Sequence, residues 1–350
     1  MADAPRSGTV KSVSRRPRSS PAELLGDPGV LGPEPALEAF GSAAVAAVGG
    51  VAVLPLRGDW LRARAADVVA VPWWPDAGAD RFAQVVVHLQ KGRAATWQAL
   101  AEGWRRLDPG GRLLLLGGND LGVKSAVKRL AAELDAPGEV VANRAHARAV
   151  CWRRDDGAGP REPVAPPVAV AAGGAVFQLP SAPGIFSADG VDPGTALLLE
   201  HLVDLDAPEL VFDPGCGIGV LGLAALRRWP TARAVLADAD HRAVTCARAG
   251  AVELGLDGRC EAAWWDAEND PPPLPGCDLV LLNPPFHSGV PVDLQPARAI
   301  FRAVDTVLAP GGRALVVANR TLPWERDLER LGALRRLTDR SGYKVLEVAR

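Results

Sequence analysis

The tetrapeptide Asn-Pro-Pro-Phe at residues 283–286 follows an apolar run and offers an unusual set of polar and aromatic groups. Two successive prolines fix their own φ angles, favour extended backbone before them and remove two backbone donors. The carbonyl oxygens of Asn283 and Pro284 are therefore left to accept from other groups, while the Asn283 side chain adds an acceptor and Phe286 adds a stacking face. This set suits a planar molecule with an amino group, such as a nucleobase, although a proline-rich strand end is the simpler alternative.

A glycine-rich segment, Asp-Pro-Gly-Cys-Gly-Ile-Gly, lies upstream at residues 213–219, between an apolar run and an apolar helical pattern. Its alternating glycines allow positive φ angles and let the backbone approach a ligand closely. The acid that opens the segment falls at the carboxyl end of the expected strand, where open α/β sheets bind ligands. We therefore predict a cofactor loop formed by Asp213, Gly215, Gly217 and Gly219.

Two further acids end the next expected strands. Asp238 lies nineteen residues after Gly219 and is placed for hydrogen bonds to the hydroxyls of a ribose. Asp266 follows two tryptophans and is a candidate for contact with an adenine amino group, with a helix N-cap or a turn-forming loop acid as the alternative. The loop together with a ribose acid favours S-adenosylmethionine, which contains adenosine but no pyrophosphate. Because the same glycines also satisfy G-x-G-x-x-G, a nicotinamide-dependent oxidoreductase is an alternative.

The overall composition limits the class of protein. The chain has 350 residues, 48% of them apolar, which is enough for two packed domains. Its net charge of −2 argues against binding to nucleic acid through a pervasive positive field. The five cysteines form no close pair, so neither a Cys-x-x-Cys metal site nor a disulfide framework is indicated, and a cytoplasmic location is expected. The longest apolar run, at 43–56, is too short to span a membrane.

The order of apolar runs and turn residues predicts two α/β units. Residues 1–21 are basic and rich in Ser and Pro, which is typical of a disordered tail. Alternating strands and helices are expected over 22–152, a Pro-, Gly- and Ala-rich linker over 153–174, and a second α/β unit over 175–350. In the second unit the expected strands are 210–213, 232–237, 278–282, 313–318 and 344–348.

A short repeat relates the two units. Leu-Asp-Pro-Gly-Gly-Arg at 107–112 matches Leu-Ala-Pro-Gly-Gly-Arg at 308–313 with an offset of 201 residues, and each copy stands between a helical pattern and an apolar run. Chance similarity of a common turn is the alternative to duplication of one α/β domain.

Considered together, the motifs at 213–219, 236–238, 265–266 and 282–286 resemble those of class I S-adenosylmethionine-dependent N-methyltransferases. With the segments 183–194, 283–287, 317–320 and 343–345, the chain resembles the bacterial ribosomal RNA guanine-N2 methyltransferase family, strongly over 180–350 and weakly over 85–130. The resemblance implies two tandem Rossmann-like methyltransferase domains with central, mostly parallel seven-stranded sheets. The first would be degenerate, because the segment at 85–91 contains neither Asn-Pro-Pro nor an aromatic residue.

The family resemblance also implies a reaction and its partners. S-adenosylmethionine would be the cofactor, ribosomal RNA or a ribosomal subunit the partner, and the enzyme a monomer without metal. The methyl group would pass in line to the guanine N2 amine, held by Asn283, Pro284, Pro285 and Phe286. Stacking of the base on Phe286 would contribute about 1–3 kcal/mol. Further candidates for RNA contact are His287, Arg320 and Lys344, each with a structural or solvated role as the alternative.

Several alternatives remain at this point. The same chemistry serves a glutamine side chain of a protein or adenine N6, and a non-catalytic RNA-binding or assembly factor can keep the fold. The intact acids and glycines of the loop argue against lost chemistry. The pairs Trp73-Trp74 and Trp264-Trp265 are candidate stacking platforms, but we expect at least one member of each pair in a core.

Overall fold

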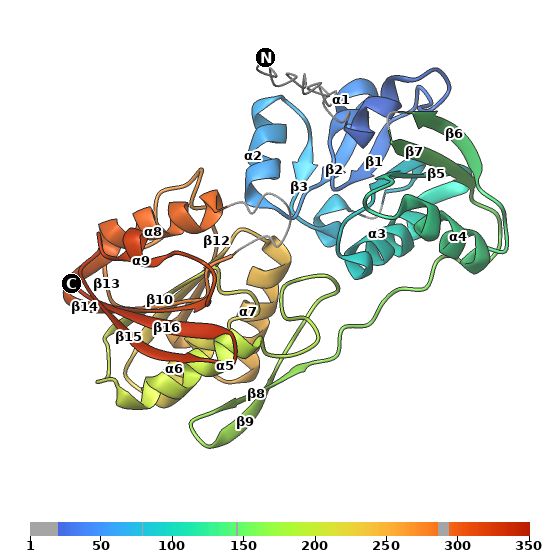
Figure 1. Ribbon diagram of the computed structural model, residues 1–350. Helices are drawn as coiled ribbons and strands as arrows, with labels where there is room; N and C mark the ends of the chain where they lie inside the picture. The colour runs from blue at the N-terminus through green and yellow to red at the C-terminus, as the bar shows by residue number, and fades with distance from the viewer. Residues whose placement is uncertain (1–19, 79, 145, 286–293) are drawn as a thin grey trace, which may run out of the picture.

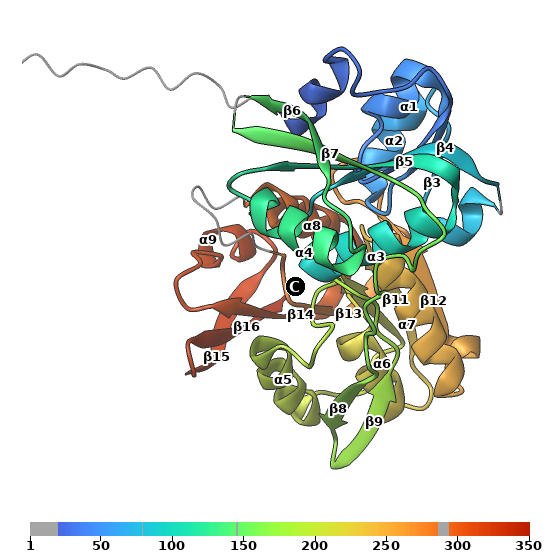
Figure 2. The same cartoon turned by 90° about the vertical axis from the view of Figure 1, so that its right-hand side faces the viewer.

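A computed structural model describes residues 20–78, 80–144, 146–285 and 294–350. The chain forms two α/β lobes, which Figures 1 and 2 show from two directions. Of the tail expected at 1–21, residues 1–19 lie outside the described residues, Ser20 is the N-cap of the 3-10 helix η1 (Pro21–Gly26), and Pro21 is its first residue. No helix in the described part of the chain is long and apolar enough to cross a membrane.

The first lobe contains a seven-stranded sheet in the order β3-β2-β1-β4-β5-β7-β6. All neighbours are parallel except β7, which runs antiparallel to β5 and β6. The strands are β1 (Ala36–Ala39), β2 (Gly50–Val53), β3 (Ala70–Val71), β4 (Phe82–His88), β5 (Leu107–Gly118), β6 (Glu139–Arg144) and β7 (Ala147–Arg153). The helices are α1 (Ala43–Val48), α2 (Arg57–Ala65), α3 (Arg93–Arg105), α4 (Val123–Glu133) and the 3-10 helix η2 (Trp74–Ala77).

The second lobe repeats this order as β12-β11-β10-β13-β14-β16-β15, with β16 as the antiparallel strand. The strands are β10 (Leu210–Pro214), β11 (Arg233–Asp238), β12 (Cys260–Trp264), β13 (Cys277–Leu282), β14 (Leu308–Asn319), β15 (Ala333–Arg340) and β16 (Tyr343–Ala349). The helices are α5 (Pro193–Glu200), α6 (Val220–Arg228), α7 (His241–Glu253), α8 (Gln295–Val307), α9 (Glu325–Leu328) and the 3-10 helices η3 (His201–Asp204) and η4 (Asp257–Arg259). The fold class expected from the sequence is thus confirmed.

The strand β13 shows why the central strands are continuous apolar runs. Leu279 and Leu281 pack into the core that α5, α6 and α7 cover, whereas Val280 and Leu282 pack into the core under α8 and α9. Successive side chains of a strand point to opposite faces, so a parallel strand covered on both faces needs an apolar residue at every position. The strand that precedes Asn283 is therefore held rigidly from both sides.

The linker expected at 153–174 is only partly irregular. Residues 168–172 form β8 (Val168–Ala172), which pairs with β9 (Ala175–Leu179) in an antiparallel hairpin. Figure 1 shows the extended segment that connects the first lobe to this hairpin. Val168 and Val170 are buried in the core of the second lobe, so the linker is shorter than its composition suggested.

Strand pairing makes the two lobes comparable residue by residue. Val85 of β4 lies opposite Leu113 of β5, and Val280 of β13 lies opposite Ala314 of β14. Leu113 and Ala314 are 201 residues apart, like the two Pro-Gly-Gly turns that open β5 and β14. Val85 and Val280 are therefore equivalent, and duplication of one domain explains both the repeat and the shared strand order.

The two lobes contact each other through equivalent segments. Val53 pairs with Ala39 in the first lobe, and Ala237 pairs with Pro214 in the second, so Val53 and Ala237 are equivalent. Leu56 and Asp240 each follow three residues later and are therefore equivalent too. These two residues form an antiparallel bridge between the lobes. Two hydrogen bonds of 2.9 Å flank the bridge, from Arg57 N to Ala239 O and from His241 N to Pro55 O. The reciprocal pattern is that of a symmetric dimer interface within one chain.

Side chains reinforce this contact between the lobes. Arg57 forms an ion pair with Asp270 through N–O distances of 3.0 and 3.2 Å, and its guanidinium lies 5.1 Å from the ring of Trp264. That ring also packs edge-on against Trp60 at 5.4 Å. The expectation for the tryptophan pairs is confirmed, because Trp74 and Trp265 are buried in cores.

Candidate functional site

The loop between β10 and α6 has the backbone that its glycines predict. The φ angles of Gly215, Gly217 and Gly219 are 78°, 54° and 87°, in the region that favours glycine. A Cβ atom at Gly219 would lie 2.9 Å from the Leu236 side chain, which explains that glycine by packing. A Cβ atom at Gly217 would meet nothing within 4 Å, so the loop backbone there borders open space.

Asp213 ends β10 and is almost fully buried beneath this loop, with 1% of its surface exposed. Its Oδ2 accepts a hydrogen bond of 2.9 Å from the amide of Gly222. Burial, together with the negative charge of Asp238, raises the pKa of Asp213 to about 7.

Asp238 ends β11 on the other side of the same loop. Its Oδ2 accepts from the Gly217 amide at 2.9 Å, and its Oδ1 accepts from the Asp240 amide at 2.8 Å. Burial and the nearby charge of Asp240 raise the pKa of Asp238 to about 6. The structure therefore brings the predicted loop glycines and both acids together at one sheet edge.

This arrangement fits S-adenosylmethionine. No described Lys, Arg or His forms an ion pair with Asp213 or Asp238, so both carboxylates lack the cation that would lower their pKa values. A ligand with a cationic centre and a ribose diol supplies that cation and the hydroxyl donors. The bare backbone at Gly217 leaves room for such a ligand beside the acids.

Asp266 lies two residues beyond β12, close to the first lobe. Its carboxylate accepts from the Glu268 amide at 3.0 Å and from the Asn269 side chain at 2.7 Å. A Cβ atom at Gly58 would lie 2.7 Å from Asp266 Oδ2. These contacts fit the turn-forming alternative, and contact with adenine stays a prediction.

The side chain of Asn283, directly after β13, is held in one orientation. Its Nδ2 donates to Asp192 Oδ2 at 3.0 Å and to Thr195 Oγ1 at 2.9 Å. A carboxylate only accepts hydrogen bonds, so the amino side of the amide must face Asp192. No described residue donates to Asn283 Oδ1, which is left as an acceptor.

Sequence analysis missed Asp192 and Thr195 as parts of this site. Asp192 is the N-cap of α5 and also accepts from the Thr195 amide at 3.0 Å, while Pro193 occupies the first helical turn. An acid followed by Pro is a recognisable helix start, but its contact with Asn283 depends on how α5 packs.

The rest of the acceptor tetrapeptide lies beside the glycine loop. Pro284 is buried and Pro285 is exposed, and the ring of Pro285 lies 3.8 Å from the position of a Cβ atom at Gly215. Phe286 and His287 lie outside the described residues. The acceptor and cofactor motifs, 64 residues apart between Gly219 and Asn283, are thus neighbours in space.

The two basic candidates for RNA contact differ in exposure. Lys344 is buried on β16, where it donates to Leu322 O at 2.7 Å and to the Glu325 carboxylate at 2.7 and 2.9 Å. The expected phosphate contact by Lys344 is therefore wrong, because its charge is neutralised inside the lobe. Arg320 is exposed and forms an ion pair with Asp339 at 2.6 Å, so its contact with RNA stays a prediction.

The equivalent strand ends of the first lobe have different side chains from those of the second lobe. Glu38 occupies the position of Asp213, and its Oε2 accepts from the amides at the start of α1 at 2.8 and 3.1 Å. His88 occupies the position of Asn283 and contacts Glu38 Oε1 at 2.6 Å. Phe40, with a φ of 62°, occupies the position of Gly215. Within the described ranges, no group of three His, Cys, Asp or Glu side chains could hold a metal ion.

Comparison with known proteins gives consistent results. Residues 177–347 match the model of the Methyltransferase small domain family. The chain is 36% identical over 274 residues to the ribosomal RNA small subunit methyltransferase C of Pseudomonas paraeruginosa strain PA7, covering 77% of this chain and 80% of the relative. It is 37% identical over 182 residues to the protein of the same name from Hahella chejuensis, covering 50% of each.

A solved structure extends this similarity over nearly the whole chain. The T. thermophilus 16S rRNA N2 G1207 methyltransferase, in complex with AdoMet and guanosine, superposes with a TM-score of 0.80 and 26% sequence identity. The match covers 96% of this chain and 92% of the other. It therefore includes both lobes.

Proposed function

The chain belongs to the ribosomal RNA small subunit methyltransferase C family, and from this premise we propose which of its residues perform the reaction. The protein is an S-adenosylmethionine-dependent methyltransferase that modifies the N2 amine of a guanosine in ribosomal RNA. We propose as target the guanosine that corresponds to the one named for the T. thermophilus enzyme. Such a substrate accords with the expected cytoplasmic location, and we propose a monomer that needs no metal.

The single observation that supports the residue roles best is the orientation of Asn283. Its amide nitrogen is occupied by Asp192 and Thr195, so its oxygen is available beside the glycine loop. The guanine N2 lone pair is delocalised into the ring and attacks poorly while the amine is planar. An acceptor at Asn283 Oδ1 and a second at the Pro284 carbonyl hold the two N–H groups and favour a pyramidal amine.

The cofactor residues follow from the fit described above. When bound, S-adenosylmethionine supplies the methyl group. Asp238 accepts from the ribose hydroxyls, Asp213 contributes negative charge beneath the loop, and Gly215, Gly217 and Gly219 let the backbone lie against the ligand. Orientation of the two reactants in one place can contribute roughly 7–11 kcal/mol to the acceleration. Phe286 completes the site as the stacking face for the base.

The first lobe has an acid, Glu38, at the position of Asp213 but not the other groups, so we propose that it does not bind the cofactor. Leu54 stands where the second lobe has Asp238, and Phe40 stands where it has Gly215. A ring on the same turn occupies space that a glycine leaves open. The first lobe then serves the reaction by positioning RNA and by supporting the second lobe.

A labelling experiment tests the proposed function. The protein is incubated with S-adenosylmethionine that has a radiolabelled methyl group and with ribosomal RNA, both free and in subunits, and the RNA is digested to nucleosides. Label in N2-methylguanosine is expected. Label in N6-methyladenosine or in protein, or none with any RNA, would contradict the proposal.

A further inference from the structure

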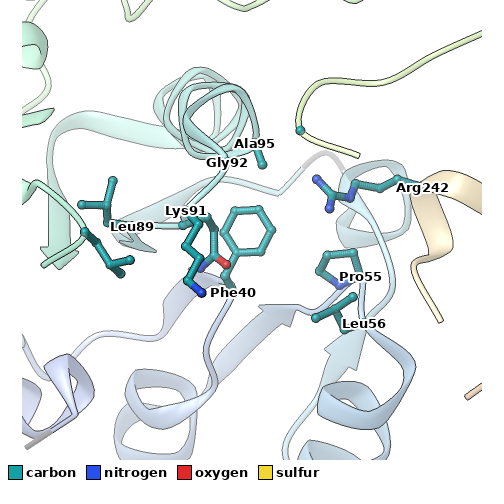
Figure 3. Close-up of a pocket in the computed structure, with 11 residues that line it drawn as sticks. Phe40, Pro55, Leu56, Leu89, Lys91, Gly92, Ala95 and Arg242 are labelled. Carbon is teal, nitrogen blue, oxygen red and sulfur yellow. The ribbon is translucent and has the colours of Figure 1, made fainter. Parts of the chain in front are cut away.

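A crevice of about 480 Å³ lies at the carboxyl ends of β1, β2, β4 and β5, where the first lobe faces the second. The position is that of the cofactor loop in the duplicated lobe. The side chains that matter to the argument are Phe40, Gln90 and Lys91 from the first lobe and Arg242 from the second. Figure 3 shows the ring of Phe40 between Lys91 and Arg242.

The charge of this crevice is opposite to that of the cofactor site. Lys91 is exposed at the position equivalent to Phe286, and no described carboxylate forms an ion pair with it. The acid that would bind a ribose is replaced by Leu54, which is buried. A cationic cofactor is therefore disfavoured here, whereas an anionic group is attracted.

Arg242 lines the crevice, but its charge is already paired and its side chain is held in place. Its guanidinium makes an ion pair with Asp240 at 2.5 Å, donates to Pro183 O at 3.3 Å, and lies 6.0 Å from the Phe40 ring. The ring is thus held at the lobe interface by a cation–π contact. Phe40 offers a rigid surface for stacking.

The remaining groups match the parts of a nucleotide. Gln90 Nε2 donates to His88 O at 3.1 Å, which fixes the amide and leaves its oxygen to accept from a base. The volume lies within the range of about 300–1,000 Å³ that is usual for small-molecule sites. We propose that this crevice binds one nucleotide of the substrate RNA, with the base against Phe40 and the phosphate against Lys91.

The surroundings favour an RNA strand over a free nucleotide. Exposed basic residues continue from the crevice at the starts of α3 and α4, namely Arg93 and Lys124, and further along α4 at Lys128. Arg93 Nη2 lies 3.4 Å from Ser125 Oγ, which connects these two helix starts. On the other side, Gly184 of the crevice begins the segment that leads to Asp192, the residue that orients Asn283. A strand in the crevice therefore continues toward the acceptor site, and this step depends on the proposed function.

Charge reversal tests the phosphate contact. Lys91 is exposed and forms no ion pair with a described carboxylate, so Lys91→Glu should fold, and thermal unfolding checks this. Its matched control is Arg233→Glu, an exposed cation at the opposite, amino end of the second sheet. We expect Lys91→Glu to weaken RNA binding at least tenfold. The slope of the logarithm of RNA affinity against the logarithm of salt concentration should also fall by about one, as expected for the loss of one phosphate contact. Cofactor affinity and kcat at saturating RNA should change less than twofold, as should every parameter of the control.

A second variant tests the stacking contact. Phe40→Leu keeps an apolar residue but removes the aromatic face, and should weaken RNA binding about five- to tenfold. Unchanged RNA affinity in either variant overturns the inference, and so does tight binding of guanosine or adenosine monophosphate that Lys91→Glu abolishes without affecting RNA. If wild-type protein makes no N2-methylguanosine, the proposed function fails; if it does and Lys91→Glu binds RNA normally, only this inference fails.

Discussion

The two lobes share a strand order but differ at the carboxyl ends of their strands. In the first lobe the buried acid Glu38 has three partners, two main-chain amides and His88. In the second lobe the described residues provide Asp213 with one main-chain donor and no cationic partner. An acid with all its partners inside the protein supports structure, whereas an acid left short of partners is available to a ligand.

The turn after the first strand shows the same difference. The Phe40 amide donates to Val53 O at 3.1 Å as the Gly215 amide donates to Ala237 O at 2.7 Å. Both residues have positive φ, so the two turns share a conformation although only the second lobe has glycine at this position. Backbone geometry is therefore retained by the fold, while a few side chains at the strand ends decide whether the edge performs chemistry.

The largest effect is expected at Asn283. Replacing an acceptor that acts on the reacting amine should lower kcat about 10²–10³-fold, by analogy with the loss of one polarising hydrogen bond in other active sites. Asn283→Ala should leave cofactor affinity within a few-fold. The matched change in the first lobe, His88→Asn, should leave kcat within about twofold. Steady-state methylation assays and calorimetric titration measure both, and equal loss of cofactor binding in Asn283→Ala would show that its role is misassigned.

Asp238 should have the next largest effect. Asp238→Asn is expected to weaken cofactor binding about 10–100-fold, because hydrogen bonds to a charged acceptor contribute roughly 1.5–3 kcal/mol. The wild-type affinity should also depend on pH. The free carboxyl has a pKa of about 6, and a cationic ligand favours the ionised form, so affinity should fall as the pH drops below 6.

Calorimetric titration between pH 8 and pH 5 measures that dependence. Asp238→Asn should show a weaker dependence than the wild type. An affinity that is constant over this range in the wild type would contradict the assignment of Asp238 as a cofactor ligand.

Asp192 should have a smaller effect, because it acts through Asn283. Asp192→Asn keeps an oxygen that can cap α5 but also introduces an amino group, so Asn283 loses the constraint on its orientation. We expect kcat to fall about tenfold with cofactor affinity unchanged. Asp192→Ala should lower kcat by the same factor. It should also lower the free energy of unfolding by about 1 kcal/mol, because the N-cap of α5 is lost. A stability loss without any change of kcat in Asp192→Asn would limit the residue to a structural role.

The two buried acids are expected to differ in their effects on stability rather than on activity. Ionised Asp213 costs stability at pH 8, since its pKa of about 7 in the folded state exceeds the unfolded value. Asp213→Asn should therefore raise the free energy of unfolding by ~1–3 kcal/mol at pH 8, and this gain should vanish below about pH 4. Glu38→Gln should instead lower it by about 1.5–3 kcal/mol, because it weakens charge-assisted hydrogen bonds. Denaturant unfolding of the two variants measures both, and equal signs would contradict the distinction.

Sequence alone predicted the parts of this comparison that depend on local pattern. The glycine loop, Asp238 and Asn283 follow expected strands, and the structure places them at one sheet edge as those strands predict, while their roles toward a ligand stay predictions. The ion pair of Lys344 with Glu325, and the contact of Asp192 with Asn283, depend on how separate elements pack. Glu38 was missed because its loop has no glycine pattern, and its equivalence to Asp213 emerges only from strand register. The hairpin strand β8 was hidden by the prolines that precede it.

The central claim is that only the second of two duplicated lobes binds the cofactor. Calorimetric titration of the full chain with S-adenosylmethionine tests it most directly, with Asp238→Asn and Phe40→Leu as the paired variants. The account predicts one cofactor per chain, with binding weakened by Asp238→Asn and unchanged by Phe40→Leu. Two cofactors per chain, or one whose binding is lost in Phe40→Leu and kept in Asp238→Asn, would contradict it.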